Sequence, residues 1–135
     1  MHRSFLMTAA LLGALGVVLG AFGAHGLKDL VLPETVEAFK TGVQYQMYHV
    51  FALLFIGIVW SKFSSKSLQW AANCFLVGIL LFSGSLYVIT ILKATDAEGL
   101  GKLGIVTPIG GLFFIVGWLL LFVSLLKKSP EQGEV

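Results

Sequence analysis

The sequence predicts an all-α membrane protein, a bundle of four transmembrane helices with an amphipathic interfacial segment between the first and second helices. Hydrophobic residues make up 57% of the 135 residues and charged residues 12%, about half the charged share of a soluble domain. A helix needs about 20 apolar residues to cross a bilayer. Four stretches of 24, 21, 26 and 24 residues carry no charge, and they lie between Arg3 and Lys28, Lys40 and Lys62, Lys66 and Lys93, and Lys102 and Lys127.

These stretches are continuously apolar, as the segment CFLVGILLFSGSLYVITIL in the third of them illustrates. A transmembrane barrel would alternate apolar and polar residues, and a soluble bundle would present a wide polar face on each helix. Both are excluded. We expect one domain with helices at about residues 4–25, 44–61, 68–92 and 105–126, followed by a mobile tail at 127–135.

The first span is rich in glycine on one face. Gly13, Gly16, Gly20 and Gly23 follow one another at intervals of three and four residues, which leaves that face almost free of side chains. Such faces permit close contact between membrane helices. We therefore expect helix packing here, within the chain or between copies. The apolar stretch is longer than that of a secretory signal, so we expect it to stay in the mature protein.

The segment at residues 26–44 has the pattern of an amphipathic helix. Pro33 suits the first turn of a helix, and the apolar and charged residues that follow it fall on opposite faces. Such a segment either lies along the membrane interface or extends the second helix outward. The apolar positions are Val36, Phe39 and Val43, and the charged positions are Glu34, Glu37 and Lys40.

Polar residues gather where the spans end on the side of this segment. Tyrosine is common at membrane interfaces, and Ser or Gln can join helices by hydrogen bonds, so structural roles are one interpretation of the cluster. A ligand-binding site in the outer leaflet is the other. The candidate ligand-binding residues are His25, Gln44, Tyr45, Tyr48, His49, Ser83, Tyr87, Thr90 and Thr107.

The histidines of this cluster allow a further class of function. Imidazole can bind a metal or haem, or exchange protons near neutral pH. The first two helices would bring His25 and His49 to a similar depth, although no i, i+4 pair of histidines supports a metal site. Cys74 is the single cysteine, which excludes dithiol chemistry within one chain. The spans contain no Asp or Glu, which disfavours a carboxylate-coupled transporter.

The fourth span begins with the motif TPIGG. Pro108 loosens the hydrogen bonding of the helix backbone, and Gly110 and Gly111 allow close packing. We expect a kink and a helix contact at this position. Trp118 lies deeper in the span, and we expect it to pack within the bundle.

The distribution of basic residues predicts the orientation. With four crossings both termini share a side, which holds five basic residues against four, so the positive-inside rule places both termini in the cytoplasm. The basic residues form no dense stripe that could follow a nucleic acid. The five are Arg3, Lys62, Lys66, Lys127 and Lys128, and the four are Lys28, Lys40, Lys93 and Lys102.

Several stretches of the chain resemble one family of small membrane proteins. They are GAFGAHGL at 20–27, F-x-T-G-V-x-Y-Q-x-x-H at 39–49, FSGSLY at 82–87, and TPIGG with the later GW at 107–118. In these stretches the chain resembles the YgdD/YwdK-like family, which carries domain of unknown function 423 and to which the human transmembrane protein 256 is also similar. The resemblance covers about residues 8–126. It implies a four-helix protein of the bacterial cytoplasmic membrane and brings no established activity, catalytic residue or cofactor.

From these patterns we expect a non-enzymatic, multi-pass membrane protein. It would bind a lipid, a small amphiphile or a partner helix through the outer-leaflet polar cluster and the glycine face. Membrane lipids are its expected partners, and a homo-oligomer is a second option. Two alternatives stay open: a haem- or metal-binding redox protein that uses His25 and His49, and an oligomeric pore or transporter assembled through the glycine face.

Overall fold

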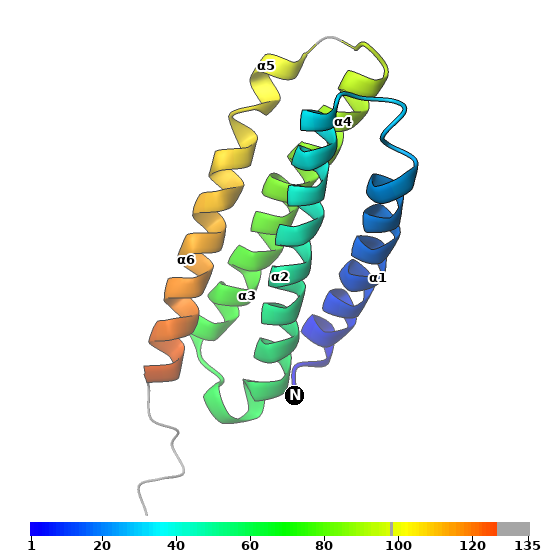
Figure 1. Cartoon of the computed structure of the whole chain (residues 1–135). Helices are drawn as coiled ribbons and strands as arrows, with labels where there is room; N and C mark the ends of the chain where they lie inside the picture. Colours follow the sequence, from blue (N-terminus) through cyan, green and yellow to red (C-terminus); the bar gives the residue numbers. More distant parts are fainter. Residues whose placement is uncertain (98, 127–135) are drawn as a thin grey trace, which may run out of the picture.

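The computed structural model describes residues 1–97 and 99–126, which form a helical bundle (Figure 1). No strand occurs in these residues. The four membrane-spanning stretches are Arg3–His25, Pro33–Phe63, Lys66–Ala94 and Gly101–Leu126, each long and apolar enough to cross a bilayer. The predicted fold class is therefore confirmed. The predicted tail at 127–135 lies outside the described residues.

The helices bear the following labels. The first two spans are single helices, the third is interrupted by one π-helical turn, and the fourth is preceded by a short helix. The elements are α1 (Arg3–His25), α2 (Pro33–Phe63), α3 (Lys66–Gly78), the π-helical turn η1 (Ile79–Ser83), α4 (Gly84–Ala94), α5 (Leu100–Leu103) and α6 (Val106–Leu126).

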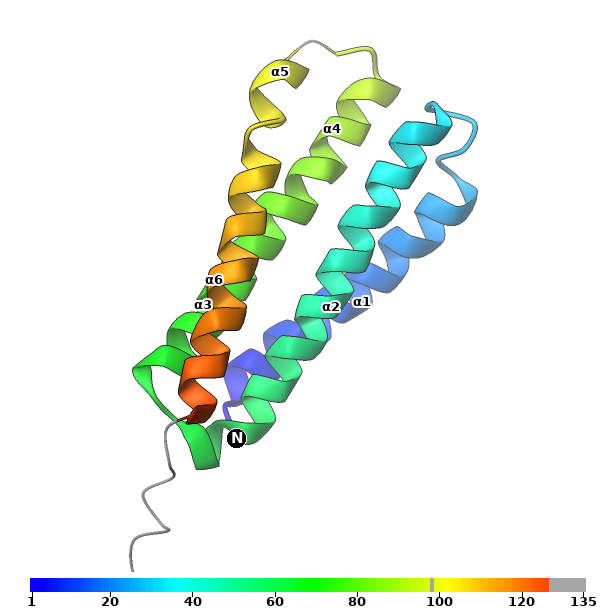
Figure 2. The same ribbon diagram turned by 60° about the vertical axis from the view of Figure 1, so that its left-hand side comes forward.

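The bundle has two distinct ends. The N-terminus, the α2–α3 turn and the end of α6 lie together at one end, the terminal side, while residues 26–32, 95–97 and 99–105 lie at the other, the loop side (Figure 1). α1 lies beside α2, and α6 lies beside α3 and α4. From the terminal side towards the loop side, α2 and α6 diverge (Figure 2).

The amphipathic segment forms the first turns of α2. Pro33 occupies the start of the helix, and Val36 and Phe39 are buried with Leu27 in a small apolar cluster against α1. Of the two alternatives left by the sequence, the segment thus extends the second helix. The predicted start of that helix at residue 44 is eleven residues late, because these apolar contacts continue α2 out to Pro33.

The glycine face of α1 lies against α2 within the chain. A Cβ atom at Gly16 would come within 2.6 Å of the Met47 sulfur, and one at Gly23 within 2.8 Å of the Phe39 ring. A larger residue at either position would require the Met47 or Phe39 side chain to move. A glycine also allows close packing between α3 and α6, where a Cβ at Gly117 would lie 2.6 Å from the Phe75 ring.

The main apolar core fills the terminal half of the bundle. Its largest fully buried members come from α2 and α3, and α1 and α6 contribute further members; the largest are Leu53, Ile56, Leu68 and Phe75. In the loop half the apolar cluster lies between α1, α2 and the loop that joins them, with Tyr87 of α4 against it, and α6 contributes no member. The loop half therefore leaves room between α2 and α6, and this is where the candidate site lies.

Candidate functional site

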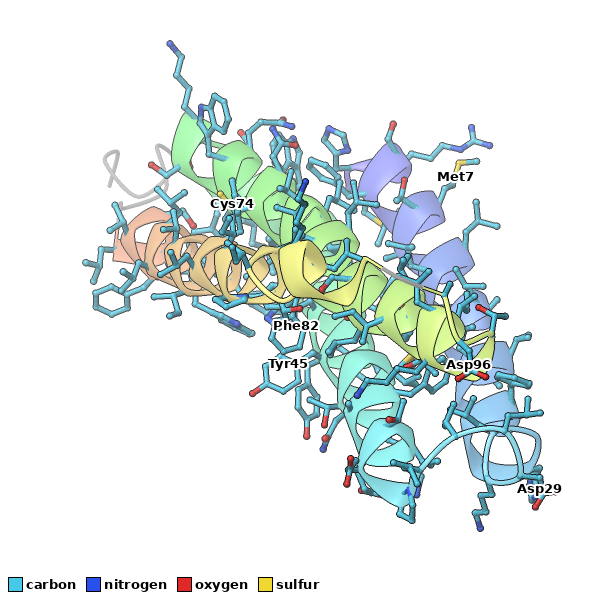
Figure 3. All side chains as sticks on the ribbon, turned by 90° about the horizontal axis from the view of Figure 1, so that it is seen from above. Met7, Asp29, Tyr45, Cys74, Phe82 and Asp96 are labelled. Carbon is cyan, nitrogen blue, oxygen red and sulfur yellow. The ribbon has the colours of Figure 1, made fainter. Side chains whose placement is uncertain are left out.

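A groove of about 780 Å³ lies between α2 and α6. Its walls are mainly aromatic and aliphatic, and none of the described side chains that line it carries a charge. Three predicted site residues are among them, and Figure 3 shows one of these, Tyr45, beside Phe82 between the two helices. The lining residues are Tyr45, Tyr48, His49, Phe51, Phe82, Pro108, Gly111, Leu112, Phe114, Ile115 and Trp118.

The groove has the length of about one membrane leaflet. Ten residues separate Pro108 from Trp118, the first and last α6 residues of the lining, and ten residues of helix span about 15 Å. This is half of a hydrocarbon core about 30 Å thick. On α2 the lining ends at Phe51, the midpoint of the charge-free stretch between Lys40 and Lys62. The groove therefore occupies the loop-side leaflet.

His49 is buried at the back of the groove. Its Nδ1 lies 2.6 Å from the carbonyl oxygen of Tyr45, and because a carbonyl only accepts, Nδ1 carries the proton and donates. Nε2 then has a free lone pair, which accepts from the Trp118 indole N–H at 3.1 Å. The imidazole stacks on the Phe114 ring with centroids 3.5 Å apart. Both ring nitrogens are occupied, and neither is left for a metal or haem iron.

His25 lies far from His49, so the expectation of a shared depth is wrong. Gly23 of α1 faces Phe39 of α2, and Phe39 and His49 are ten residues apart, or about 15 Å along the helix. His25 lies at the end of α1 beyond Gly23 and is exposed. The early start of α2 causes this difference, because it places His49 well inside the bundle. Among the described residues, no group of three or more His, Cys, Asp or Glu could hold a metal.

Two tyrosines provide the polar end of the groove, which we call the mouth. The Tyr48 hydroxyl accepts from the Gln44 amide at 2.5 Å, which leaves its own hydrogen free to donate. Tyr45 stacks on Phe82 with ring centroids 4.6 Å apart, and its hydroxyl has no hydrogen-bond partner among the described residues. Side chains of a helix lean towards its N-terminus, so both phenols lean towards the loop side. The mouth thus offers two O–H donors.

Ser83 and Tyr87 belong to a different feature, a buried seam that joins α1, α2 and the third span. The Gln46 amide donates to the Leu12 carbonyl at 2.7 Å, and its oxygen accepts from the Tyr87 hydroxyl at 2.7 Å. Ser83 donates to the Gly42 carbonyl at 2.6 Å. These groups bond to one another or to the backbone, so the seam is structural.

The remaining predicted residues also serve helix contacts. Thr90 donates to the Leu86 carbonyl within α4 at 2.8 Å, and Thr107 shares a hydrogen bond of 2.6 Å with Ser85, which ties α6 to α4. Gly110 meets the backbone of Phe82, whereas a Cβ at Gly111 would lie 3.9 Å from the Phe82 ring in ordinary contact. Gly111 therefore faces the groove and leaves it open.

Three aromatic residues that line the groove, Phe82, Phe114 and Trp118, were not predicted as site residues from the sequence. Phe82 lies in the π-helical turn η1, a distortion that often occurs at functional sites. Trp118, expected inside the bundle, is 48% exposed, and its inner edge packs against Phe75 and His49. An aromatic residue within an apolar span does not stand out from its apolar neighbours in the sequence. For Trp118, the GW motif was the one feature that drew attention to the position.

Comparisons with known proteins place the chain among bacterial membrane proteins. A family model described as "Protein of unknown function (DUF423)" matches residues 19–111. A UPF0382 membrane protein of Staphylococcus haemolyticus is 39% identical over 125 residues, covering 93% of this chain and 97% of the relative. The UPF0382 membrane protein YwdK of Bacillus subtilis is 37% identical, with 93% and 98% covered, and a Haemophilus influenzae relative is 36% identical, with 96% and 98% covered. No solved structure gives a significant match.

Proposed function

We infer a function from the site alone, because the chain belongs to the DUF423 family, whose members are described only as proteins of unknown function. The resemblance predicted from the motifs is confirmed. Its relatives are named membrane proteins without a stated activity. Our proposal is that this membrane protein binds one lipid or similar small amphiphile in the groove between α2 and α6, without a catalytic step.

The chemistry of the groove carries this proposal. Ligand sites usually measure about 300–1,000 Å³ and combine apolar walls with a few placed polar groups. The groove has about 780 Å³, and its polar groups, the Tyr45 and Tyr48 hydroxyls, lie at one end. An amphiphile with an apolar chain and uncharged acceptor oxygens matches this arrangement, because its chain would lie against the apolar walls and its oxygens would accept from the two hydroxyls. The ester carbonyls of a glycerolipid are such acceptors.

The dimensions favour a chain over a partner helix. The groove has a volume of about 780 Å³ and a length of about 15 Å, which suits one extended apolar chain. A helix with its side chains is about 10–12 Å wide and needs roughly 80–110 Å². A helix of that width would occupy the whole opening, whereas an extended apolar chain lies lengthwise between the aromatic walls and is the occupant we propose.

The two alternatives find less support in the geometry. A redox site built on both histidines would need His25 and His49 on one metal or haem, yet the two lie far apart and His49 uses both of its ring nitrogens. A pore assembled through the glycine face would need α1 to leave α2, because Gly16 and Gly23 pack there within the chain. A colourless, metal-free preparation would agree with this reasoning.

We further propose that the protein resides in the cytoplasmic membrane with both termini in the cytoplasm, so that the groove opens in the outer leaflet. The excess of basic residues on the terminal side supports this orientation. With Cys74 replaced by Ala, a cysteine at Asp29 should react with a membrane-impermeant maleimide in intact cells. A cysteine at Ser64, in the α2–α3 turn, should react only after permeabilisation. The opposite labelling pattern would reverse the orientation.

Filling the groove tests the proposed function. Gly111→Leu adds a side chain that points into the groove without an initial clash, since the nearest atom to its Cβ lies at 3.9 Å. Native mass spectrometry of the purified wild type should show one retained lipid, and Gly111→Leu should lose most of that occupancy. The matched control is Gly101→Leu, because nothing lies within 4 Å of a Cβ there. Equal lipid occupancy in all three proteins would refute the proposal.

A further inference from the structure

Trp118 lies at the deep end of the groove. It is the last α6 residue that lines the groove, and three residues further along, Leu121 is buried in the main apolar core. The tryptophan side chain leans towards the N-terminus of α6, so its ring lies near the middle of the charge-free stretch between Lys102 and Lys127. An apolar chain that enters from the mouth therefore meets the indole near the centre of the membrane.

The indole is held in place by His49. A half-exposed tryptophan in lipid has few neighbours to restrict its rotamer, and the hydrogen bond of 3.1 Å from its N–H to His49 Nε2 supplies a fixed partner. His49 is itself fixed by its bond to the Tyr45 carbonyl and by stacking on Phe114. Phe75 packs against the indole from α3 with ring centroids 5.1 Å apart. The floor of the groove is thus built on three helices.

A polar side chain at this depth requires an explanation. Burying an imidazole without partners is costly, and a leucine at position 49 would pack into the core without that cost. In His49 one nitrogen meets the backbone of its own helix and the other meets Trp118. His49 therefore adds one interaction between helices that an apolar residue could not make. Its Nε2 accepts the hydrogen bond from the Trp118 indole.

We propose that Trp118 sets the length of the apolar chain that the groove accepts, and that His49 is the residue that positions Trp118. The inference rests on the proposed function, which it extends from binding to chain-length selection. Chains that end before the indole fit entirely within the groove. Longer chains must bend out of it at Trp118 and lose contact with its walls.

A competition among lipids of different length tests this inference. The purified full-length protein would be mixed with an equimolar series of saturated phosphatidylcholines of increasing acyl length, and native mass spectrometry would give the relative occupancy of each. For Trp118→Ala the ratio of the longest to the shortest bound lipid should rise roughly tenfold, because methylenes that fill the vacated space gain packing contacts. Trp70→Ala is the matched control, since Trp70 is exposed on α3 and does not line the groove.

Variants of His49 separate positioning from simple packing. His49→Leu removes the acceptor and should shift the profile towards longer chains, by less than Trp118→Ala. His49→Gln should restore the wild-type profile, because the amide oxygen can accept from the indole. Trp118→Phe keeps a ring without the N–H donor and should give an intermediate shift. This variant keeps the test decisive if Trp118→Ala fails to fold.

The outcomes distinguish the two proposals. If the wild type retains none of the phosphatidylcholines, the proposed function and this inference fail together. If the wild type binds them and both Trp118 variants keep the Trp70→Ala profile, chain-length selection by Trp118 is overturned while binding in the groove stands. If His49→Leu matches the wild type although the Trp118 variants shift, the positioning role of His49 is overturned.

Discussion

Buried polar side chains determine how the helices of this protein meet. His49 and Gln46 both lie inside charge-free stretches, where an unpaired polar group is costly, and each side-chain nitrogen and oxygen of the two residues has a hydrogen-bond partner. Gln46 bonds to the Leu12 carbonyl and the Tyr87 hydroxyl, while His49 bonds to the Tyr45 carbonyl and the Trp118 indole. The first residue fixes α2 to α1 and α4, and the second fixes α2 to α6.

Removing the centre of the seam should destabilise the fold. Gln46→Leu leaves the half-buried Tyr87 hydroxyl without its acceptor, so we expect a loss of about 1–3 kcal/mol in the free energy of unfolding. Tyr87→Phe should cost only about 0.6 kcal/mol, typical of one hydrogen bond between membrane helices. The double variant should lose less than the sum of the two. Unfolding in detergent micelles followed by circular dichroism measures all three, and additive losses would rule out a direct bond.

The helices show which features a sequence can predict. Charge-free stretches predicted four spans, because a span excludes charge along its own length. The start of α2 depends on packing between Val36, Phe39 and Leu27 of the preceding loop, which is a tertiary contact, and an error of eleven residues there misplaced His49 relative to His25. Tyr45, Tyr48 and His49, which line the groove, could be named as candidates because polar residues stand out in an apolar stretch. Phe82 and Phe114 carry no such contrast.

The contact between α6 and the π-helical turn η1 gives a prediction for neighbouring glycines. A Cβ at Gly110 would clash with the backbone of Phe82, which cannot move aside, whereas one at Gly111 meets only the Phe82 ring in ordinary contact. Gly110→Ala should therefore lower stability by about 1–3 kcal/mol, the cost of overpacking, and Gly111→Ala should stay within about 0.5 kcal/mol of the wild type. Thermal unfolding of both variants compares them directly, and equal stabilities would contradict the close approach.

The whole bundle combines a packed half with an open half. Apolar side chains from α1, α2, α3 and α6 fill the terminal half, so the divergence of α2 and α6 creates the groove in the loop half alone. The groove ends where the packed half begins, at Trp118 and His49. A four-helix protein of this kind thus presents one leaflet with a compact surface and the other with a site of about 780 Å³.

The central claim is that this groove holds one amphiphile. An experimental structure of the protein in lipid nanodiscs tests it most directly. We expect a single elongated density between α2 and α6, with its polar end at the Tyr45 and Tyr48 hydroxyls and its apolar end at Trp118. A groove filled by the protein's own side chains, or covered by a helix of a second copy with no such density beneath it, would contradict the account.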